Sequence, residues 1–261
     1  FEEEFLEIPE EVLITSMKEH QRYFPVKSTS GKLLPYFVTV RNGDHNHLEK
    51  VAKGNEKVLR ARLADAAFFY REDQKSDIAD LQKKLENIVY HEEIGTLAKK
   101  VERVRRLTNT ITDIIGLSVE EKEAADRAAE ISKFDLVTHM VYEFPELQGF
   151  MGEKYALQKG EKEAVAVAIN EHYMPRNADD QTPASNVGAV LAITEKLDTI
   201  VSFMAIGVTA SGSQDPYALR RQAAGIIQTL SKKEWEVSFE VLVDEAINLV
   251  TVDNISKRTN K

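Results

Sequence analysis

Apolar residues recur at helical spacing over most of the chain, and this periodicity limits the fold more than any other feature of the sequence. The clearest apolar stripe lies within residues 183–206, and its members are Val187, Val190, Leu191, Thr194, Leu197, Val201 and Met204. Thr182 precedes this stripe as a predicted N-cap, and Pro183 takes the first helical position, where a missing N–H costs nothing. The sequence therefore predicts a mainly α-helical protein.

The same periodicity predicts helices over most of the chain after residue 54. Asn55 is the predicted N-cap of a helix that runs to about residue 73. Further helices are predicted at about 76–88, 97–115, 119–132, 135–144, 161–173 and 216–230. We expect one helical domain over 55–235, with residues 236–261 as the start of a following helical region.

The first 54 residues have a different pattern, which predicts a small α+β unit. Pro9 opens a short helix, and two segments rich in aromatic and β-branched residues, 22–27 and 35–41, read as strands. Gly31 lies in the turn between them, where a positive φ is accessible to it. We expect residues 1–54 to be part of a larger N-terminal region, because the chain begins at Phe1 without an initiator Met.

Composition excludes several classes of protein. The 261 residues include no cysteine, which rules out disulfides, thiolate catalysis and Cys-based zinc sites. No apolar run reaches the roughly 20 residues of a membrane-spanning helix, and we expect a cytoplasmic protein with no membrane partner. The net charge of -9 argues against non-specific binding of nucleic acid, so that any contact with RNA must come from local basic patches.

One candidate patch lies at the start of the helix predicted from Asn55. Lys57, Arg60 and Arg62 follow one another closely, and an Arg side chain offers a planar fork that binds phosphate oxygens. The alternative is an ordinary solvated face, paired with Glu56 and Asp65. Arg103, Arg105 and Arg106, which alternate with Glu102, are read as a solvated face.

The second candidate is the segment GSQDPYALRR at residues 212–221. Asp215 is the predicted N-cap of a helix whose first turn contains Pro216, and Arg220 and Arg221 follow one turn later. The N-terminus of a helix with two arginines is a suitable site for an RNA phosphate or a partner's carboxylate. The alternative is a capped helix whose arginines form ion pairs within the domain.

The sequence does not predict a complete catalytic centre. There is no G-x-S-x-G motif, no P-loop and no G-x-G-x-x-G, and GNEK at residues 54–57 lacks the P-loop spacing. His139, His172 and Glu195 are the metal-ligand candidates, but a metal site needs three or four converging ligands. The alternative is that these histidines are satisfied residues of the core or its rim.

The segment AITEKLDTI, residues 192–200, resembles the last helix of the HD phosphohydrolase superfamily. In that superfamily an aspartate closes a metal site, and the matching position here is Glu195. The superfamily also has a His-Asp dipeptide, which is absent from this sequence. The resemblance implies an HD-like helical domain without an intact metal site, and a metal-dependent phosphohydrolase is the alternative.

Several longer blocks, in the same order, resemble the beta subunit of the two-subunit bacterial glycyl-tRNA synthetase. They are EVLITSMKEHQRYFPV at 11–26, LPYFVTVRNG at 34–43, GNEKVLRARLADAAFFYRED at 54–73, KFDLVTHMVYEFPELQGFMGEKYA at 133–156, NEHYMP at 170–175, EKLDTI at 195–200, and GSQDPYALRR. The resemblance implies an internal fragment that lacks the C-terminal anticodon-binding domain.

In this family the alpha subunit holds the synthetic site and uses ATP and Mg, so that we expect no cofactor in this fragment. The implied partners are the alpha subunit and tRNA(Gly), in a heterotetramer. We expect this fragment to support glycyl-tRNA formation by positioning tRNA or by docking the alpha subunit, with Lys57, Arg60, Arg62, Asp215, Arg220 and Arg221 as contact candidates. A purely structural module at a subunit interface is a further alternative.

Overall fold

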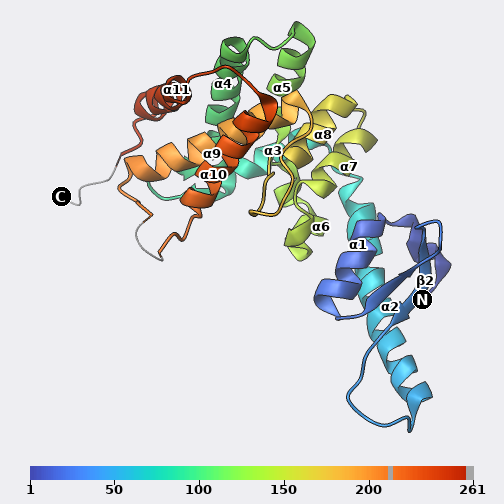
Figure 1. Cartoon of the computed structure of the whole chain (residues 1–261). Helices are drawn as coiled ribbons and strands as arrows, with labels where there is room; N and C mark the ends of the chain where they lie inside the picture. The colour runs from blue at the N-terminus through green and yellow to red at the C-terminus, as the bar shows by residue number, and fades with distance from the viewer. Residues whose placement is uncertain (211–213, 257–261) are drawn as a thin grey trace. The chain divides into compact units, whose positions relative to one another are not determined.

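A computed structural model describes residues 1–210 and 214–256 of the chain, which is mainly helical as predicted (Figure 1). Its contacts divide the chain into two compact units. The smaller unit comprises Phe1–Ser76 and Thr138–Gln148, and the larger comprises Asp77–Val137 and Gly149–Lys261. The domain limits at residues 54/55 and 235/236, which follow the sequence pattern, stay predictions. None of the described helices is both long and apolar enough to cross a membrane.

The smaller unit combines one two-stranded sheet with helices, which confirms the predicted α+β unit. Its elements are η1 (Glu3–Glu7), α1 (Glu10–Thr15), η2 (Ser16–His20), β1 (Phe24–Lys27), β2 (Leu33–Val38), α2 (Leu48–Asp73), α6 (His139–Glu143) and η5 (Pro145–Leu147). Strands β1 and β2 are antiparallel, with Phe24 opposite Val38 and Lys27 opposite Leu33. Gly31 has a φ of +83° in the turn between them, as the turn requires.

Helix α2 begins at Leu48, and the prediction that Asn55 is its N-cap is therefore wrong. Residues 48–53 are mostly good helix formers, so that the helix extends through this segment and past Gly54. Asn55 instead lies inside the helix and ties it to the strand region. Its side-chain oxygen accepts a hydrogen bond from the Tyr23 hydroxyl at 3.2 Å, and its Nδ2 donates to Thr39 Oγ1 at 3.3 Å.

The larger unit is a cluster of helices with one short strand pair. Its elements are α3 (Ile78–Lys84), η3 (Leu85–Asn87), β3 (Val89–His91), β4 (Gly95–Thr96), α4 (Leu97–Ile115), α5 (Val119–Ile131), η4 (Phe134–Val137), α7 (Phe150–Gln158), α8 (Glu163–Glu171), α9 (Asn186–Ala205), α10 (Leu219–Lys233) and α11 (Phe239–Val252). The strand pair β3–β4 and helix α7 were not predicted, and the helix expected over 135–144 is divided between η4 and α6.

Helix α9 is the central element of the larger unit. It contacts α4, α5, α8, α10 and α11 (Figure 1), and most of its residues are buried, including Ala192, Ile193 and Leu197. Polar side chains on such a helix are held inside the protein, where each needs a partner.

The start of α9 is fixed by a buried carboxylate, and the prediction of Thr182 and Pro183 as its first residues is wrong. Glu171, at the end of α8, accepts hydrogen bonds from the backbone N–H groups of Ala184 and Ser185 at 2.8 and 3.2 Å. The hydroxyl of Ser185 caps the helix by accepting from the N–H of Gly188 at 2.9 Å. Because Ser185 has an extended backbone conformation and its side chain caps the helix, α9 begins after it, and Glu171 binds the N–H groups that precede the first turn.

Candidate functional site

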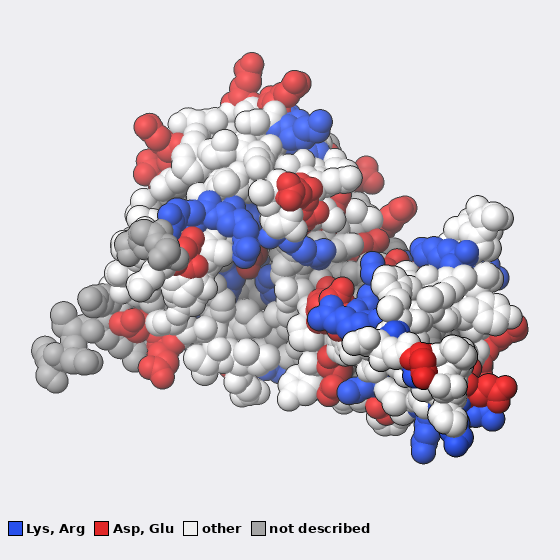
Figure 2. All heavy atoms as spheres, turned by 60° about the horizontal axis from the view of Figure 1, so that its bottom comes forward, with Lys and Arg blue, Asp and Glu red and all other residues white. Residues whose placement is uncertain are grey.

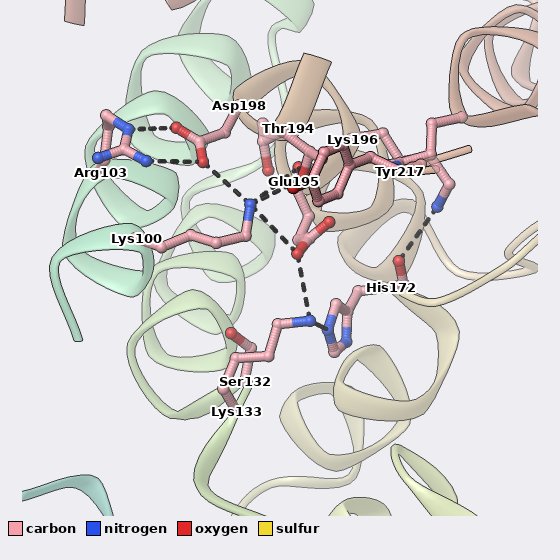
Figure 3. A network of polar contacts seen from close by, with 12 residues as sticks. Lys100, Arg103, Ser132, Lys133, His172, Thr194, Glu195, Lys196, Asp198 and Tyr217 are labelled. Carbon is pink, nitrogen blue, oxygen red and sulfur yellow. Dashed lines mark hydrogen bonds and ion pairs between the residues drawn. The ribbon is translucent and has the colours of Figure 1, made fainter. Parts of the chain in front are cut away.

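The larger unit contains a buried polar network in which α4 supplies cations and α9 supplies carboxylates (Figure 3). Lys100 and Arg103 stand three residues apart on α4, and Glu195 and Asp198 do the same on α9, so that each pair shares one helix face. The Arg103 guanidinium donates to both oxygens of Asp198, through Nη2 at 3.0 Å and through Nε. Lys100 Nζ lies 3.0 Å from Asp198 Oδ2.

Glu195 is the carboxylate between two lysines. Its Oε1 lies 3.4 Å from Lys100 Nζ and 3.2 Å from Lys133 Nζ, and the two lysine side chains are almost fully buried. Burial alone raises the pKa of Glu195, but the charges of Lys100 and Lys133 outweigh it and hold the pKa well below its usual value. Glu195 is therefore ionised and balances buried positive charge.

The three lysines of the network differ in their proton affinity. Burial opposes the charge of Lys100, yet Glu195 and Asp198 raise its pKa above the ordinary value. For Lys133 burial dominates, and its pKa is lowered. Burial also lowers the pKa of Lys196 to about 8; its ammonium donates to the carbonyls of His172 and Met174 at 3.3 and 2.8 Å.

His172 completes the network as a neutral imidazole. Its Nδ1 lies 2.6 Å from the carbonyl oxygen of Ile169, which can only accept, so that Nδ1 carries the proton. Burial and the charge of Lys133 lower its pKa well below the usual value. The remaining nitrogen, Nε2, therefore accepts a hydrogen bond from Lys133 Nζ at 2.8 Å.

Two of the three metal-ligand candidates, His172 and Glu195, lie in the larger unit, and the third lies in the smaller unit. His172 and Glu195 both contact the ammonium of Lys133, which lies where a metal ion would need to bind them (Figure 3). His139 belongs to the smaller unit, where its Nδ1 and backbone N–H lie 2.9 and 2.8 Å from Asp73 Oδ1. Within residues 1–210 and 214–256, no group of three or more His, Asp or Glu side chains could hold a metal ion.

Lys57, Arg60 and Arg62 are all exposed on α2, but they differ in their partners. Arg60 forms an ion pair with Glu2, although its side chain remains 64% exposed. Lys57 and Arg62 form no ion pair with any residue that the structure describes, and the expected pairs with Glu56 and Asp65 are absent among those residues. The partner Glu2 is distant in sequence, so that helical spacing gave no signal for it.

On the face drawn in Figure 2, basic side chains do not form one continuous patch. Figure 2 shows Lys and Arg in several separate groups, with acidic side chains between them. A surface of this kind favours contacts with individual phosphates over a broad electrostatic attraction to nucleic acid.

The second candidate segment begins a helix later than predicted. Helix α10 starts at Leu219, after Ala218 in a left-handed conformation, so that the placement of Pro216 in its first turn is wrong. The N-cap residue is Ala218 and not Asp215 as predicted, although the Asp215 carboxylate accepts from the N–H groups of Leu219 and Arg220 at 2.8 and 3.0 Å. These two N–H groups are thereby occupied by Asp215 and are not free to bind an anion. Gly212 and Ser213 lie outside the described residues.

The electrostatics of this helix start are set by Asp215 and two arginines. Desolvation raises the pKa of Asp215, but the N–H groups of Arg220 and Leu219 and the charges of Arg220 and Arg221 hold it below the usual value. Both arginines are exposed, and Arg220 Nε lies 3.9 Å from Asp215. Arg221 forms no ion pair with any described residue, which leaves its guanidinium available for a ligand.

The arginines read as a solvated face of α4 are instead all paired. Arg103 is only 1% exposed, Arg105 binds Asp126 and Glu130, and Arg106 binds Asp253. The reading is wrong for Arg103 because Asp198, far along the chain, compensates its buried charge. The position of Lys100 and Arg103 beside the apolar stripe of Val104 and Leu107 is the signal that indicates a buried ion pair.

Comparisons with known proteins agree with the resemblance found in the sequence. The profile of the family described as glycyl-tRNA synthetase beta subunit matches residues 1–261. The glycine–tRNA ligase beta subunit of Bacillus subtilis (strain 168) is 62% identical over 243 residues, covering 93% of this chain and 36% of that protein. The corresponding subunit of Halalkalibacterium halodurans is 58% identical over 247 residues, covering 95% of this chain and 36% of that protein.

A third relative, the glycine–tRNA ligase beta subunit of Streptococcus gordonii, is 55% identical over 249 residues, covering 95% of this chain and 37% of that protein. The chain thus spans a little more than a third of the length of these relatives. The match over all of its residues, and identities far above what chance gives, confirm the resemblance: this chain belongs to the glycyl-tRNA synthetase beta subunit family.

Proposed function

We propose that this chain is part of glycine-tRNA ligase, which joins glycine to tRNA(Gly) with conversion of ATP to AMP and diphosphate. Its role is to position the tRNA so that the 3′ end reaches the active site of the alpha subunit, where ATP and Mg are used. Positioning of this kind lowers a barrier by several kcal/mol without any chemical residue in the positioning module.

The observation that supports this role is the distribution of free positive charge. The chain has a net charge of -9, yet Lys57, Arg62 and Arg221 are exposed and form no ion pair with a described residue. Exposed guanidinium and ammonium groups without partners are suited to individual phosphates of a folded RNA. Arg60 and Arg220 belong to the same two candidate surfaces, and Asp215 fixes the start of the helix that presents Arg220 and Arg221.

An HD-like fold without metal chemistry accounts best for the buried network. Glu195 on α9 and His172 after α8 are the kind of residues that hold a metal in such a fold, but both contact Lys133 here. A lysine ammonium cannot act as a Lewis acid or lower the pKa of a bound water as a metal ion does. Elemental analysis of the purified protein tests this: stoichiometric divalent metal together with phosphohydrolase turnover would favour the alternative.

We propose that the full alpha–beta enzyme is a cytoplasmic heterotetramer. A tRNA-binding experiment on this enzyme tests the role of the exposed charges. Replacing Lys57, Arg62 and Arg221 together by Ala should weaken binding of tRNA(Gly) and reduce the slope of log K against log salt by about two. Glu163→Gln, at an exposed position on α8, is a control that should leave the slope unchanged. An unchanged slope in the triple variant would contradict the proposal.

A second candidate role, docking of the alpha subunit, is favoured by an apolar groove on the larger unit. The groove has a volume of about 500 Å³ and lies between α9, α10 and α11, lined by side chains that include Val201, Met204, Phe239 and Ile247. Met204 and Ile247 are about half exposed, as expected of a surface that another protein covers. Co-purification of the alpha subunit with an Ile247→Asp variant, after removal of tRNA, tests it: undiminished association would exclude this groove.

A further inference from the structure

Tyr217 presents a half-open aromatic ring on the surface of the larger unit. Its ring stacks on that of Phe203, with a centroid distance of 3.8 Å and an interplanar angle of 22°. Phe203 is only 2% exposed, whereas Tyr217 is 38% exposed. The ring of Tyr217 is therefore supported from the protein side and accessible to a ligand elsewhere.

The aromatic residues below Tyr217 hold its support in place. The ring of Phe203 also contacts His91 and Tyr90, at centroid distances of 5.5 and 5.7 Å. Tyr90 in turn lies below the buried ammonium of Lys100, 5.0 Å from its ring centroid, which connects the aromatic cluster to the polar network of α4 and α9. A ring fixed in this way loses little conformational entropy when a planar ligand stacks on it.

His91 supplies a hydrogen-bond donor near the same ring. Its Nδ1 accepts from the backbone N–H of Glu93 at 3.2 Å, so that in the neutral imidazole the proton is on Nε2. Nε2 has no hydrogen-bond partner among the described residues. The ring of His91 meets that of Tyr217 edge-on, with centroids 6.4 Å apart.

Two cations lie three and four residues after Tyr217 in the chain. Arg220 and Arg221 are exposed in the first turn of α10, and the Asp215 carboxylate fixes where that turn begins. An open aromatic ring with guanidinium groups a few residues further along the chain is a combination suited to single-stranded nucleic acid, since bases stack on the ring and phosphates bind the cations.

We propose that Tyr217 is a stacking platform for an unpaired base of the bound tRNA, with Arg221 on a neighbouring phosphate. This inference rests on the proposed tRNA-binding role and specifies the part of the RNA that is recognised. A base inside a duplex has its faces covered by its neighbours, so that the platform selects a nucleotide from a loop or a single-stranded end. Tyr217 is thus a positioning residue that fixes the register of the tRNA.

Substitutions of Tyr217 in the full alpha–beta enzyme separate stacking from charge. Tyr217→Leu should raise the Kd for tRNA(Gly) about tenfold, equal to ~1.4 kcal/mol, with the salt slope unchanged. Tyr217→Phe keeps the ring, and its Kd should equal that of the unmodified enzyme. Arg221→Ala should reduce the slope of log K against log salt by about 0.7 to 0.9, because one phosphate contact is lost.

A second measurement uses the unmodified enzyme, so that its result does not depend on whether a variant folds. Ultraviolet crosslinking to tRNA(Gly), followed by peptide mapping, should attach a nucleotide to the peptide that contains Tyr217. A Tyr217→Leu enzyme with undiminished affinity would overturn the inference even if Arg221→Ala binds weakly, and the tRNA-binding role would then stand without it. The inference would also be overturned if the Tyr217→Leu variant lost association with the alpha subunit and no nucleotide crosslinked to Tyr217 in the unmodified enzyme. That result would assign the ring to a protein partner.

Discussion

Lys133 donates a hydrogen bond from its ammonium to Nε2 of His172 at 2.8 Å, and both side chains are buried. The arrangement places the ammonium of Lys133 between an imidazole nitrogen and the carboxylate of Glu195. A buried cation is tolerated only when it is paired and hydrogen-bonded. The network therefore belongs to the stability of the helical unit, and the following predictions test its parts.

Removing the carboxylate of the network should be strongly destabilising. Glu195→Gln leaves the buried charges of Lys100 and Lys133 without their shared counter-charge, and the expected loss is about 3–5 kcal/mol in the free energy of unfolding. Urea unfolding followed by circular dichroism measures it. Glu163→Gln, at an exposed position on α8, is the matched control and should change stability by less than about 0.5 kcal/mol. Equal stabilities of the two variants would contradict the assignment.

Asp135 should give the protein a pH-dependent stability of unusual sign. Burial raises its pKa from the ordinary 3.8 to about 6, although the N–H of Gly149 opposes this by donating to the carboxylate at 2.6 Å. Between these two pKa values the folded protein binds the proton and the unfolded chain does not. The contribution of the Asp135 carboxyl to the free energy of unfolding is therefore greatest below about pH 4. It falls as the pH rises to 6 and is constant above that.

An Asp135→Asn variant isolates this contribution. The stability of the unmodified protein minus that of the variant should decrease by ~2 kcal/mol between pH 4 and pH 7. Denaturant unfolding at a series of pH values gives both quantities. A difference that rises over this range would show that the folded state favours the ionised carboxylate.

Gly188 should be irreplaceable because of the carboxylate that starts α9. A Cβ at this position would lie 2.6 Å from Cβ of Glu171 and would overlap its Oε2, displacing the acceptor of the Ala184 and Ser185 N–H groups. Gly188→Ala should therefore destabilise by about 1–3 kcal/mol, despite the better helix propensity of Ala.

Gly54 offers a matched control for this substitution. It also lies inside a helix, α2, but a Cβ there would meet no atom within 4 Å. Gly54→Ala should stabilise by ~0.5–1 kcal/mol, and thermal unfolding of both variants gives the comparison. If the Gly188→Ala protein were as stable as the Gly54→Ala protein, the hydrogen bonds of Glu171 to the start of α9 would not contribute to stability.

Helical periodicity predicted the helical architecture, whereas the ends of the helices depended on residues distant in sequence. Residues 97–115 are helical as predicted, because one apolar stripe decides the whole segment. The predicted start of α9 was wrong because Ser185 is the N-cap, and Glu171 of α8 accepts hydrogen bonds from the N–H groups of residues 184 and 185 before the first turn. The predicted start of α2 was wrong because Asn55, although a residue type common at N-caps, forms its hydrogen bonds with the strand region.

The candidate site shows the same division. The prediction of Asp215 as N-cap was wrong by position, since Ala218 is the N-cap, but the hydrogen bonds of Asp215 to the start of α10 could be found from sequence because Leu219 and Arg220 are close neighbours along the chain. The pairing of Arg60 with Glu2 depends on how elements pack and has no local signal. For Arg103 the apolar stripe beside it indicates burial, but nothing local identifies Asp198 as its partner. The role of Lys133 was missed for this reason, since His172 and Glu195 come from other helices.

The most direct test of the positioning role is the steady-state kinetics of the complete alpha–beta enzyme with Lys57, Arg62 and Arg221 all changed to Ala. A role in holding tRNA predicts that KM for tRNA(Gly) rises at least tenfold, while glycine-dependent exchange of diphosphate into ATP, which needs no tRNA, stays at the unmodified rate. An unchanged KM for tRNA, or a loss of the exchange reaction in a folded and assembled enzyme, would contradict the account.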